Sequence, residues 1–181
     1  MDPIGHLIPR QRVPDLSLPL AGGGSWRLSD QKPEHFTMVA FYRGRHCSVC
    51  RDYLGRLQSM HAAFSRLGVT PIAVSMDSAE RACAAEADWG LTDLCVAYGL
   101  SLPQAREWGL YVSRGCGRTS LGLEEPAMFA EPALFLVRPD HTLYFASVQS
   151  MPFGRPCFEE ILHAIEMAVA GRYPARGEVT E

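Results

Sequence analysis

The sequence has no long apolar run, no excess of positive charge and a single lysine, Lys32. No stretch of its 181 residues approaches the roughly 18 consecutive apolar residues that a membrane-spanning helix needs, so we expect no membrane segment. The formal net charge of −3 gives no electrostatic reason to expect a nucleic-acid partner. Charged residues make up 20% and hydrophobic residues 47% of the chain, which is typical of an ordinary globular protein.

The first twenty residues also lack the basic and apolar regions of a secretory signal peptide. Prolines recur there at positions 3, 9, 14 and 19, and charged residues interrupt the segment. We therefore expect a cytoplasmic protein with mostly reduced thiols and without structural disulfides. The six cysteines are then left as metal ligands, catalytic thiols or small core residues.

Hydrophobic periodicity predicts alternating strands and helices along the chain. The order predicts a mixed sheet with helices on both faces, because a right-handed β-α-β unit is followed by a hairpin and a helix. This is the α/β thioredoxin-like plan, extended by an N-terminal hairpin. The expected elements are the hairpin strands 15–20 and 25–28, the strands 36–42, 69–75, 94–98, 133–137 and 142–148, and the helices 54–67, 79–89, 103–108 and 156–170.

The length suits one domain, which we expect to span residues 1–171. Residues 111–130 contain glycine and serine without a clear period and are interpreted as an insertion. Its role as a dimer surface, a lid or a substrate groove stays open. Residues 172–181 form a polar C-terminal tail.

A Cys-x-x-Cys pair, Cys47 and Cys50, stands between a predicted buried strand and a predicted helix. At this spacing both sulfurs lie on one face of the first helical turn and can close a small disulfide. Unpaired N–H groups and the helix dipole favour thiolate over thiol at a helix N-terminus. By position, we expect Cys47 to attack and the more buried Cys50 to resolve.

Positive groups surround the pair, and no acidic residue occurs from 36 to 50. Such a setting is expected to lower the thiol pKa, and the thiolate is the species that attacks disulfides or peroxides. A solvated arginine-rich turn and an ordinary loop histidine are the alternatives. The candidate thiolate-stabilising residues are Arg43, Arg45, His46 and Arg51.

Pro132 directly precedes the predicted strand 133–137. In the thioredoxin plan a proline at this point is expected to be cis and to shape the groove beside the dithiol. An ordinary proline at a strand entry is the alternative.

The remaining cysteines form no second pair at metal-ligand spacing, so we expect no zinc or other metal site. Cys83 and Cys95 lie among alanine, tryptophan and leucine and are expected to be small core residues. Cys116, in the insertion, and Cys157, at the beginning of the last helix, are candidates to resolve a disulfide or to link subunits, with a spectator role as the simpler alternative.

The segment Phe-Tyr-Arg-Gly-x-x-Cys-x-x-Cys at residues 41–50 resembles the AhpC/TSA (alkyl hydroperoxide reductase/thiol-specific antioxidant) branch of the thioredoxin-like superfamily, and within it peroxiredoxin-like proteins. The resemblance extends loosely from Pro14 to Ala170. It implies a redox-active disulfide as the only cofactor and a thioredoxin- or glutathione-type electron donor. A homodimer stays open.

Two departures from the peroxidase pattern matter. Peroxiredoxins carry Pro-x-x-x-Thr-x-x-Cys at this loop, where this chain has Arg43, Cys47 and Cys50 in register. The family's peroxide-polarising arginine precedes the later strand, where this chain has Pro132. The sequence therefore predicts a thiol–disulfide oxidoreductase. Its alternatives are a peroxiredoxin-like peroxidase acting on hydroperoxides and a non-enzymatic redox-sensing or partner-binding module.

Overall fold

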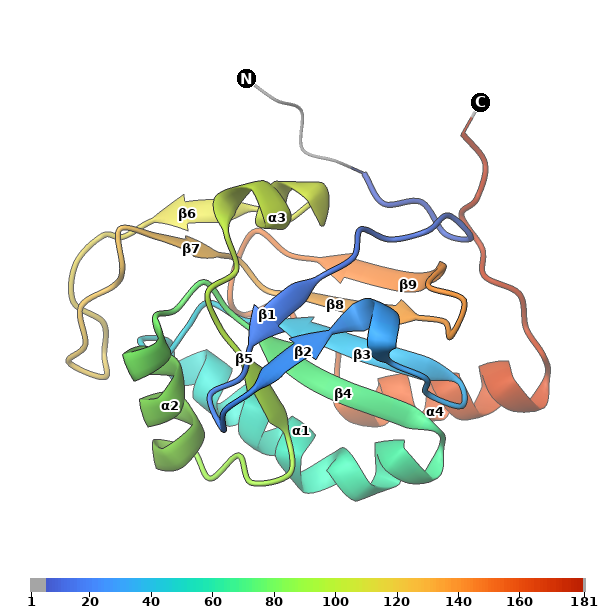
Figure 1. The fold of residues 1–181 in the computed structure, drawn as a ribbon, viewed down its shortest axis with the longest axis horizontal. Helices are drawn as coiled ribbons and strands as arrows, with labels where there is room; N and C mark the ends of the chain where they lie inside the picture. Colours follow the sequence, from blue (N-terminus) through green and yellow to red (C-terminus); the bar gives the residue numbers. More distant parts are fainter. Residues whose placement is uncertain (1–5, 181) are drawn as a thin grey trace.

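A five-stranded mixed sheet organises the computed structural model, which describes residues 6–180 (Figure 1). The strand order is β5-β4-β3-β8-β9, with β3, β4 and β5 parallel and with β8 antiparallel to both of its neighbours. The sheet strands are β3 (Phe36–Phe41), β4 (Val69–Val74), β5 (Cys95–Ala97), β8 (Ala133–Val137) and β9 (Leu143–Val148).

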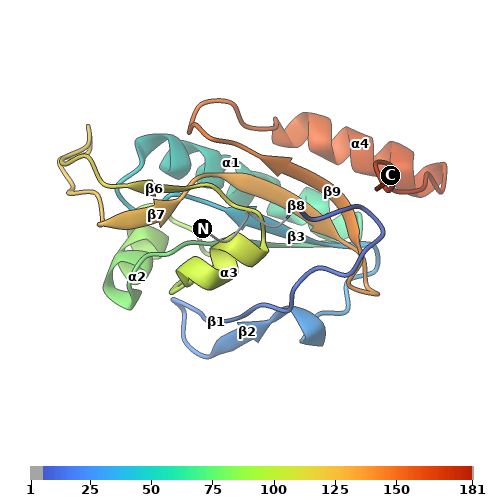
Figure 2. The same ribbon diagram turned by 90° about the horizontal axis from the view of Figure 1, so that it is seen from above.

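Helices and a hairpin cover both faces of this sheet. Helices α1 and α4 lie on one face, whereas the β1–β2 hairpin and α3 lie on the other (Figure 2). Helix α2 packs against the edge strand β5. These elements are β1 (Ser17–Pro19), β2 (Ser25–Arg27), a short 3-10 turn (Leu28–Asp30), α1 (Ser48–Arg66), α2 (Ala79–Asp88), α3 (Leu102–Glu107) and α4 (Phe158–Ala170).

Alternation along the central strand β3 divides the core into two layers, since successive side chains of a strand point to opposite faces. Met38 and Ala40 pack in the layer that contains Leu54 and Leu57 of α1. Val39 and Phe41 pack in the opposite layer, with Trp108 and the hairpin. Every residue of β3 is buried, which explains the near-continuous apolar run in its sequence.

The architecture confirms the thioredoxin-like fold with its hairpin extension. The insertion is more ordered than its composition indicates, because β6 (Val112–Arg114) and β7 (Met128–Ala130) pair as a small antiparallel ribbon. Sequence analysis missed these two short strands because the segment around them has no clear hydrophobic period. None of the helices in the described part of the chain is long and apolar enough to cross a membrane.

Candidate active site

Cys47 and Cys50 lie where the chain leaves β3 and enters α1. Cys47 is the N-cap residue of the helix, and its Sγ accepts a hydrogen bond from the backbone N–H of Cys50 at 3.2 Å. Both cysteines are reduced; Cys47 retains 4% of its surface and Cys50 none. The sulfur of Cys47 thus occupies the place where a serine or aspartate oxygen usually caps a helix, which favours negative charge on it.

The two thiols have opposite electrostatic environments. Hydrogen bonds from the Cys50 side chain and backbone, together with the nearby Arg155 and Arg43, lower the pKa of Cys47 to about 6 in spite of burial. Burial first, and then the neighbouring Cys47, raise the pKa of Cys50 well above its ordinary value. At neutral pH the pair therefore holds one thiolate, on Cys47, and one thiol, on Cys50.

The guanidinium of Arg155 reaches both sulfurs, although sequence analysis did not select this residue. Its Nη2 lies 3.1 Å from Cys50 Sγ and 3.9 Å from Cys47 Sγ. Its Nε donates to the carbonyl of Pro152 at 2.7 Å, and the group lies over the ring of Tyr53. The only sequence signal is an arginine in the approach to the last helix.

Arg43 lies in a charged cluster between the dithiol loop and the insertion. Its guanidinium is 3.2 Å from Glu125 and 3.5 Å from Glu131, and all three side chains are largely buried. It also lies over the ring of Phe129 in β7, 4.5 Å from the centroid. Glu125 and Glu131, which sequence reasoning missed, therefore hold the insertion against the entrance to α1.

His46 is fully buried and packs against the ring of Phe129, with 4.7 Å between the ring centroids and an angle of 56° between the ring planes. Burial and the neighbouring Arg43 lower its pKa to about 4. His46 is therefore neutral near pH 7 and supplies no positive charge to the thiolate.

Asp77, which follows β4, fixes the backbone of the same loop. Its Oδ2 accepts from the backbone N–H of Arg45 at 2.7 Å, and its Oδ1 accepts from Arg81 Nε at 3.0 Å. Gly44 lies directly against this carboxylate with φ +130°, and a Cβ added there would come within 2.7 Å of Asp77 Oδ1. The close approach and the positive φ together explain the glycine in the 41–50 segment.

Two of the predicted thiolate-stabilising arginines are directed elsewhere. The Arg45 guanidinium pairs with Asp88 of α2 at 2.8 Å, and that of Arg51 pairs with Asp52 at 3.0 Å. These arginines are neighbours of the dithiol in sequence but do not gather around it in space, because neighbouring side chains of the loop point in different directions. Of the four predicted groups, the structure brings the positive charge of Arg43 toward Cys47.

The expectation of a cis peptide bond at Pro132 is wrong, since residues 6–180 contain no cis peptide bond. Ala133, the next residue, pairs with Phe41 at the carboxyl end of β3. Pro132 therefore lies at the same end of the sheet as the dithiol loop, and its carbonyl accepts from the N–H of Gln149 at 3.0 Å. It is a trans proline at a strand entry, the form that X-Pro bonds ordinarily prefer. Its groove-shaping role stays a prediction.

The expectation that Cys83 and Cys95 are core residues is also wrong, because both are exposed. Cys83 lies on the outer part of α2, and its Sγ donates to the carbonyl of Ala21 at 3.4 Å. Helix α2 buries the smaller Ala82 and Ala85 instead.

The two candidate resolving cysteines are exposed and engaged locally. Cys116 Sγ lies 3.7 Å from the carbonyl oxygen of Arg114, and Cys157 Sγ donates to Glu159 Oε2 at 3.0 Å. Neither contacts the sulfurs of the dithiol, so a resolving role stays a prediction. Within residues 6–180, no group of three or more His, Cys, Asp or Glu side chains is placed to hold a metal ion.

Comparisons with solved structures find the same fold in redox proteins. The chain superposes on peroxidoxin BcpB from Mycobacterium tuberculosis with a TM-score of 0.70, 17% identity, and coverage of 91% of this chain and 99% of that one. The reduced 2-Cys peroxiredoxin of Plasmodium vivax superposes with a TM-score of 0.72 and 15% identity, over 91% of this chain and 98% of that one. A structure from Chlorobium tepidum assigned as a thiol:disulfide interchange protein, DsbE, superposes with a TM-score of 0.64 and 22% identity, over 90% of this chain and 98% of that one.

A search of curated proteins returns no match to this chain. The sequence profile of the AhpC/TSA family, by contrast, matches residues 9–146. That range includes the N-terminal hairpin, the dithiol, the insertion and most of the sheet. The chain belongs to the AhpC/TSA family.

Proposed function

We propose that this protein is a thiol–disulfide oxidoreductase that uses Cys47 as the nucleophile and Cys50 as the resolving thiol. Membership of the AhpC/TSA family makes it a thiol-dependent oxidoreductase. One observation supports the finer assignment: the pKa of Cys47 is lowered to about 6, whereas that of the buried Cys50 is raised. A dithiol with these pKa values has one sulfur that is a thiolate and can attack at neutral pH, and a second that stays a thiol until it resolves the mixed disulfide.

The reaction needs only the two cysteines as its redox group. The Cys47 thiolate attacks one sulfur of a substrate disulfide, whose S–S bond breaks, and the leaving thiolate takes a proton. Cys50, the resolving thiol, then gives up its proton and attacks Cys47 Sγ in the mixed disulfide. The second substrate thiol leaves, so the substrate is reduced by two electrons and the Cys47–Cys50 disulfide is formed.

A separate reductant must then return the enzyme to the dithiol form. We assign this step to a thioredoxin- or glutathione-type thiol donor, because a thiol can attack the Cys47–Cys50 disulfide by the same exchange. The small remaining exposure of Cys47 favours attack on that sulfur. The substrate is a protein or small-molecule disulfide, and no metal or organic cofactor takes part.

Hydroperoxide reduction is the second candidate, and the Arg155 contact favours it. A guanidinium 3.1 Å from Cys50 Sγ and 3.9 Å from Cys47 Sγ is placed to polarise an O–O bond beside either sulfur. A thiolate would attack one peroxide oxygen, form a sulfenic acid and release the alcohol after protonation. The other cysteine would then form the disulfide and release water.

The two activities are separated by assaying Cys47→Ser and Cys50→Ser for dithiothreitol-driven insulin reduction and for NADPH-coupled hydroperoxide consumption. We expect both variants to lose insulin reduction, and Cys50→Ser to accumulate a mixed disulfide at Cys47 that intact-mass measurement detects. Cys83→Ser, an exposed cysteine away from the pair, is the matched control.

Full wild-type insulin reduction by both variants would exclude the dithiol mechanism. Hydroperoxide turnover without insulin reduction by the wild type would instead establish the peroxidase. If the wild type catalyses neither reaction but its dithiol oxidises reversibly, the pair is a redox sensor.

A further inference from the structure

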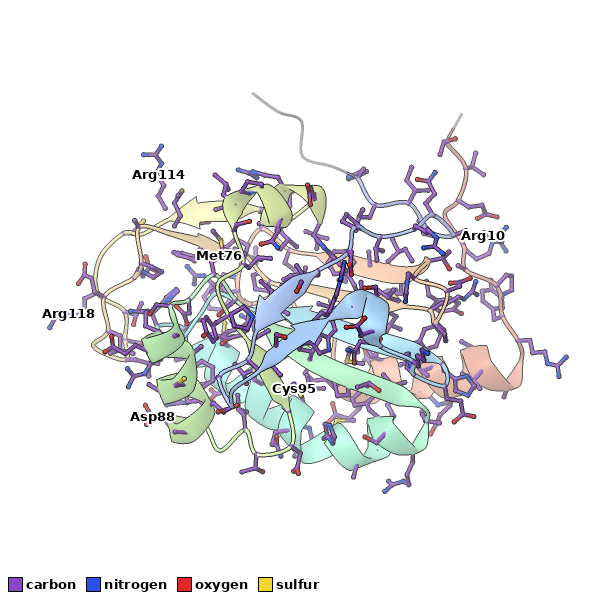
Figure 3. All side chains as sticks on the ribbon, viewed as in Figure 1. Arg10, Met76, Asp88, Cys95, Arg114 and Arg118 are labelled. Carbon is purple, nitrogen blue, oxygen red and sulfur yellow. The ribbon has the colours of Figure 1, made fainter. Side chains whose placement is uncertain are left out.

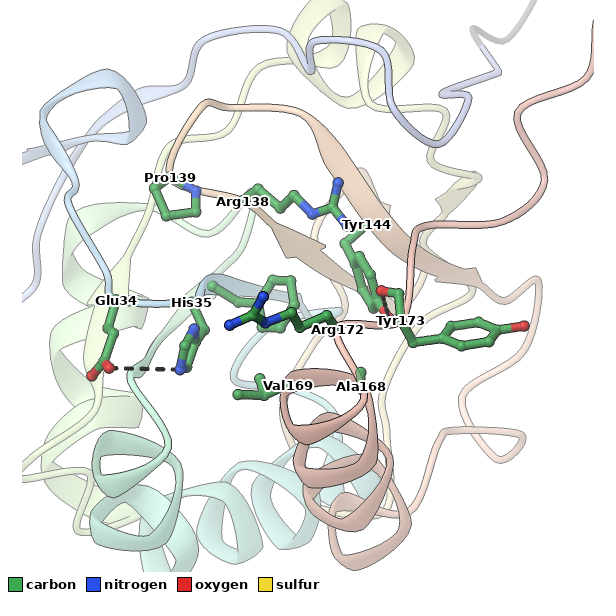
Figure 4. A pocket seen from close by; sticks show the side chains of 10 residues that line it. Glu34, His35, Arg138, Pro139, Tyr144, Ala168, Val169, Arg172 and Tyr173 are labelled. Carbon is green, nitrogen blue, oxygen red and sulfur yellow. Dashed lines mark hydrogen bonds and ion pairs between the residues drawn. The ribbon is translucent and has the colours of Figure 1, made fainter.

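Two adjoining hollows lie where α4 ends, beside β9 and the β8–β9 turn. The first has a volume of about 410 Å³ and is lined by charged and aromatic side chains, among them Arg138, Arg172 and His35 (Figure 4). The second has a volume of about 500 Å³ between β9 and α4. Tyr144, Ala168 and Tyr173 line both, so the hollows share a boundary.

The second hollow is apolar. Its walls include Leu136, Phe145, Ile161 and Ile165, and none of its lining residues carries a charge. Its volume falls within the range of pockets that hold small ligands. Because burial of apolar surface is favourable by about 25 cal/mol per Å², an alkyl chain placed here would contribute binding energy without any specific polar contact.

The first hollow offers two arginine side chains as positive charge. Arg138 and Arg172 extend into it from the β8–β9 turn and from the residue after the α4 C-cap (Figure 4). In the described part of the chain neither guanidinium has an ion-pair partner. One carboxylate, that of Glu34, also lines the hollow, 3.7 Å from the ring of His35, so the two arginines outnumber the acidic groups in the lining.

The structure around Arg138 also leaves its N–H donors available. The Arg138 guanidinium lies over the ring of Tyr144, 4.9 Å from its centroid, a contact that uses the face of the group and not its N–H bonds. Asp140, on the same turn, accepts from the Thr142 hydroxyl and N–H and forms no hydrogen bond with Arg138 within residues 6–180. In spite of burial, the Thr142 hydrogen bonds and then the nearby Arg138 and Arg12 lower the pKa of Asp140, so its charge offsets part of that of Arg138. Arg172 has φ +48°, a left-handed conformation that turns the chain sharply at the end of α4.

We propose that the two hollows together bind a single-chain amphiphile with an anionic head. The alkyl chain occupies the apolar hollow, and the carboxylate or phosphate head is held by Arg138 and Arg172. Guanidinium groups form strong charge-assisted hydrogen bonds with both kinds of head. The alkyl chain of the ligand crosses the boundary between the two hollows at Tyr144, whose hydroxyl donates to the carbonyl of Tyr173 at 3.2 Å.

This site is separate from the dithiol. His35 and Phe36 stand at the amino end of β3, whereas Cys47 follows its carboxyl end, a six-residue strand or roughly 20 Å away. A positive or negative result for amphiphile binding is therefore independent of the proposed oxidoreductase activity. Variants of Arg138 or Arg172 are expected to leave insulin reduction unchanged.

The test is isothermal titration of the full chain with decanoate, decyl phosphate and decanol. We expect one molecule of at least one anionic probe to bind per chain, at least tenfold more tightly than decanol. The carboxylate and phosphate arms identify the preferred head. Arg138→Gln and Arg172→Gln should each weaken anion binding several-fold, and Ile161→Arg should abolish it. Arg114→Gln is the matched control, because Arg114 extends into solvent from β6 (Figure 3).

Three outcomes would overturn the proposal. The first is that neither anionic probe binds. The second is that decanol binds as tightly as the anions, or that a double variant with both Arg138→Gln and Arg172→Gln binds the anions like the wild type, since then the charge plays no part. The third is that sedimentation shows a dimer that Ile161→Arg dissociates while neither probe binds the wild type, because the hollow is then an interface between two copies.

Discussion

Arg155 Nη2 lies 3.1 Å from Cys50 Sγ, although the two residues are 105 positions apart in the chain. The contact joins the approach to the last helix to the first turn of α1. It places a positive charge beside the thiol that is fully buried and beside the neighbouring thiolate of Cys47. Since Arg155 Nη1 is buried and has no hydrogen-bond partner among residues 6–180, the guanidinium that contacts the sulfurs keeps a free N–H donor.

Replacing Arg155 by methionine is expected to raise the pKa of Cys47 from about 6, because a cation that favours the thiolate is lost. We expect an upward shift of about half to one pH unit, which corresponds to roughly 1 kcal/mol. The pH dependence of the initial alkylation rate by iodoacetamide measures the shift.

Arg51→Met is the control for that experiment, because Arg51 is on the same turn of α1 as Cys50 but its guanidinium pairs with Asp52. Its alkylation profile should coincide with that of the wild type. An unchanged profile for Arg155→Met would show that the helix terminus and Cys50 suffice to lower the pKa of Cys47.

Gly44→Ala should destabilise the protein strongly. The new Cβ would meet the Asp77 carboxylate at 2.7 Å, and φ +130° is unfavourable for any residue with a side chain. We expect a loss of at least about 2 kcal/mol in the free energy of unfolding, measured with urea. Gly55→Ala, inside α1 where no atom of the described residues beyond the helix backbone lies within 4 Å of the added Cβ, should instead gain about 0.5–1 kcal/mol in the free energy of unfolding. A neutral Gly44→Ala would mean that the loop relaxes without loss.

Glu125→Gln should release the insertion from the dithiol loop, because it removes the carboxylate nearest to Arg43. Both side chains are largely buried, so we expect a loss of about 2 kcal/mol in the free energy of unfolding. Limited proteolysis should also cut residues 115–127 faster. Glu124→Gln, whose partner Arg118 is 3.9 Å away at an exposed site, should change neither measurement.

The strands, the long helices and the dithiol were predictable because each depends on local pattern. The buried run 36–42 and the spacing of Leu54, Leu57 and Phe64 report directly which faces are covered. The helix-capping position of Cys47 follows from the same strand-to-helix transition.

The partners of the dithiol were not predictable, because they depend on tertiary packing. Arg155 comes from the other end of the chain, whereas Arg45 and Arg51, adjacent in sequence, pair with Asp88 and Asp52. The cis expectation for Pro132 failed for a related reason, since it came from analogy with the fold and not from local residues.

The stability of the protein should fall between about pH 6.5 and pH 4 through His46. Burial and Arg43 lower the pKa of this histidine from 6.5 to about 4, so the unfolded chain takes up a proton in that range before the folded protein does. Proton uptake by the unfolded chain favours unfolding as the pH falls, with a contribution of about 3 kcal/mol across the window. Urea unfolding at several pH values should therefore show a shallower acid-side decline for His46→Asn than for the wild type, whatever its stability at pH 7. The solvent-exposed His163, changed to asparagine, should keep the wild-type slope. Parallel curves for His46→Asn and the wild type would show that the pKa of His46 is the same in the folded and the unfolded protein.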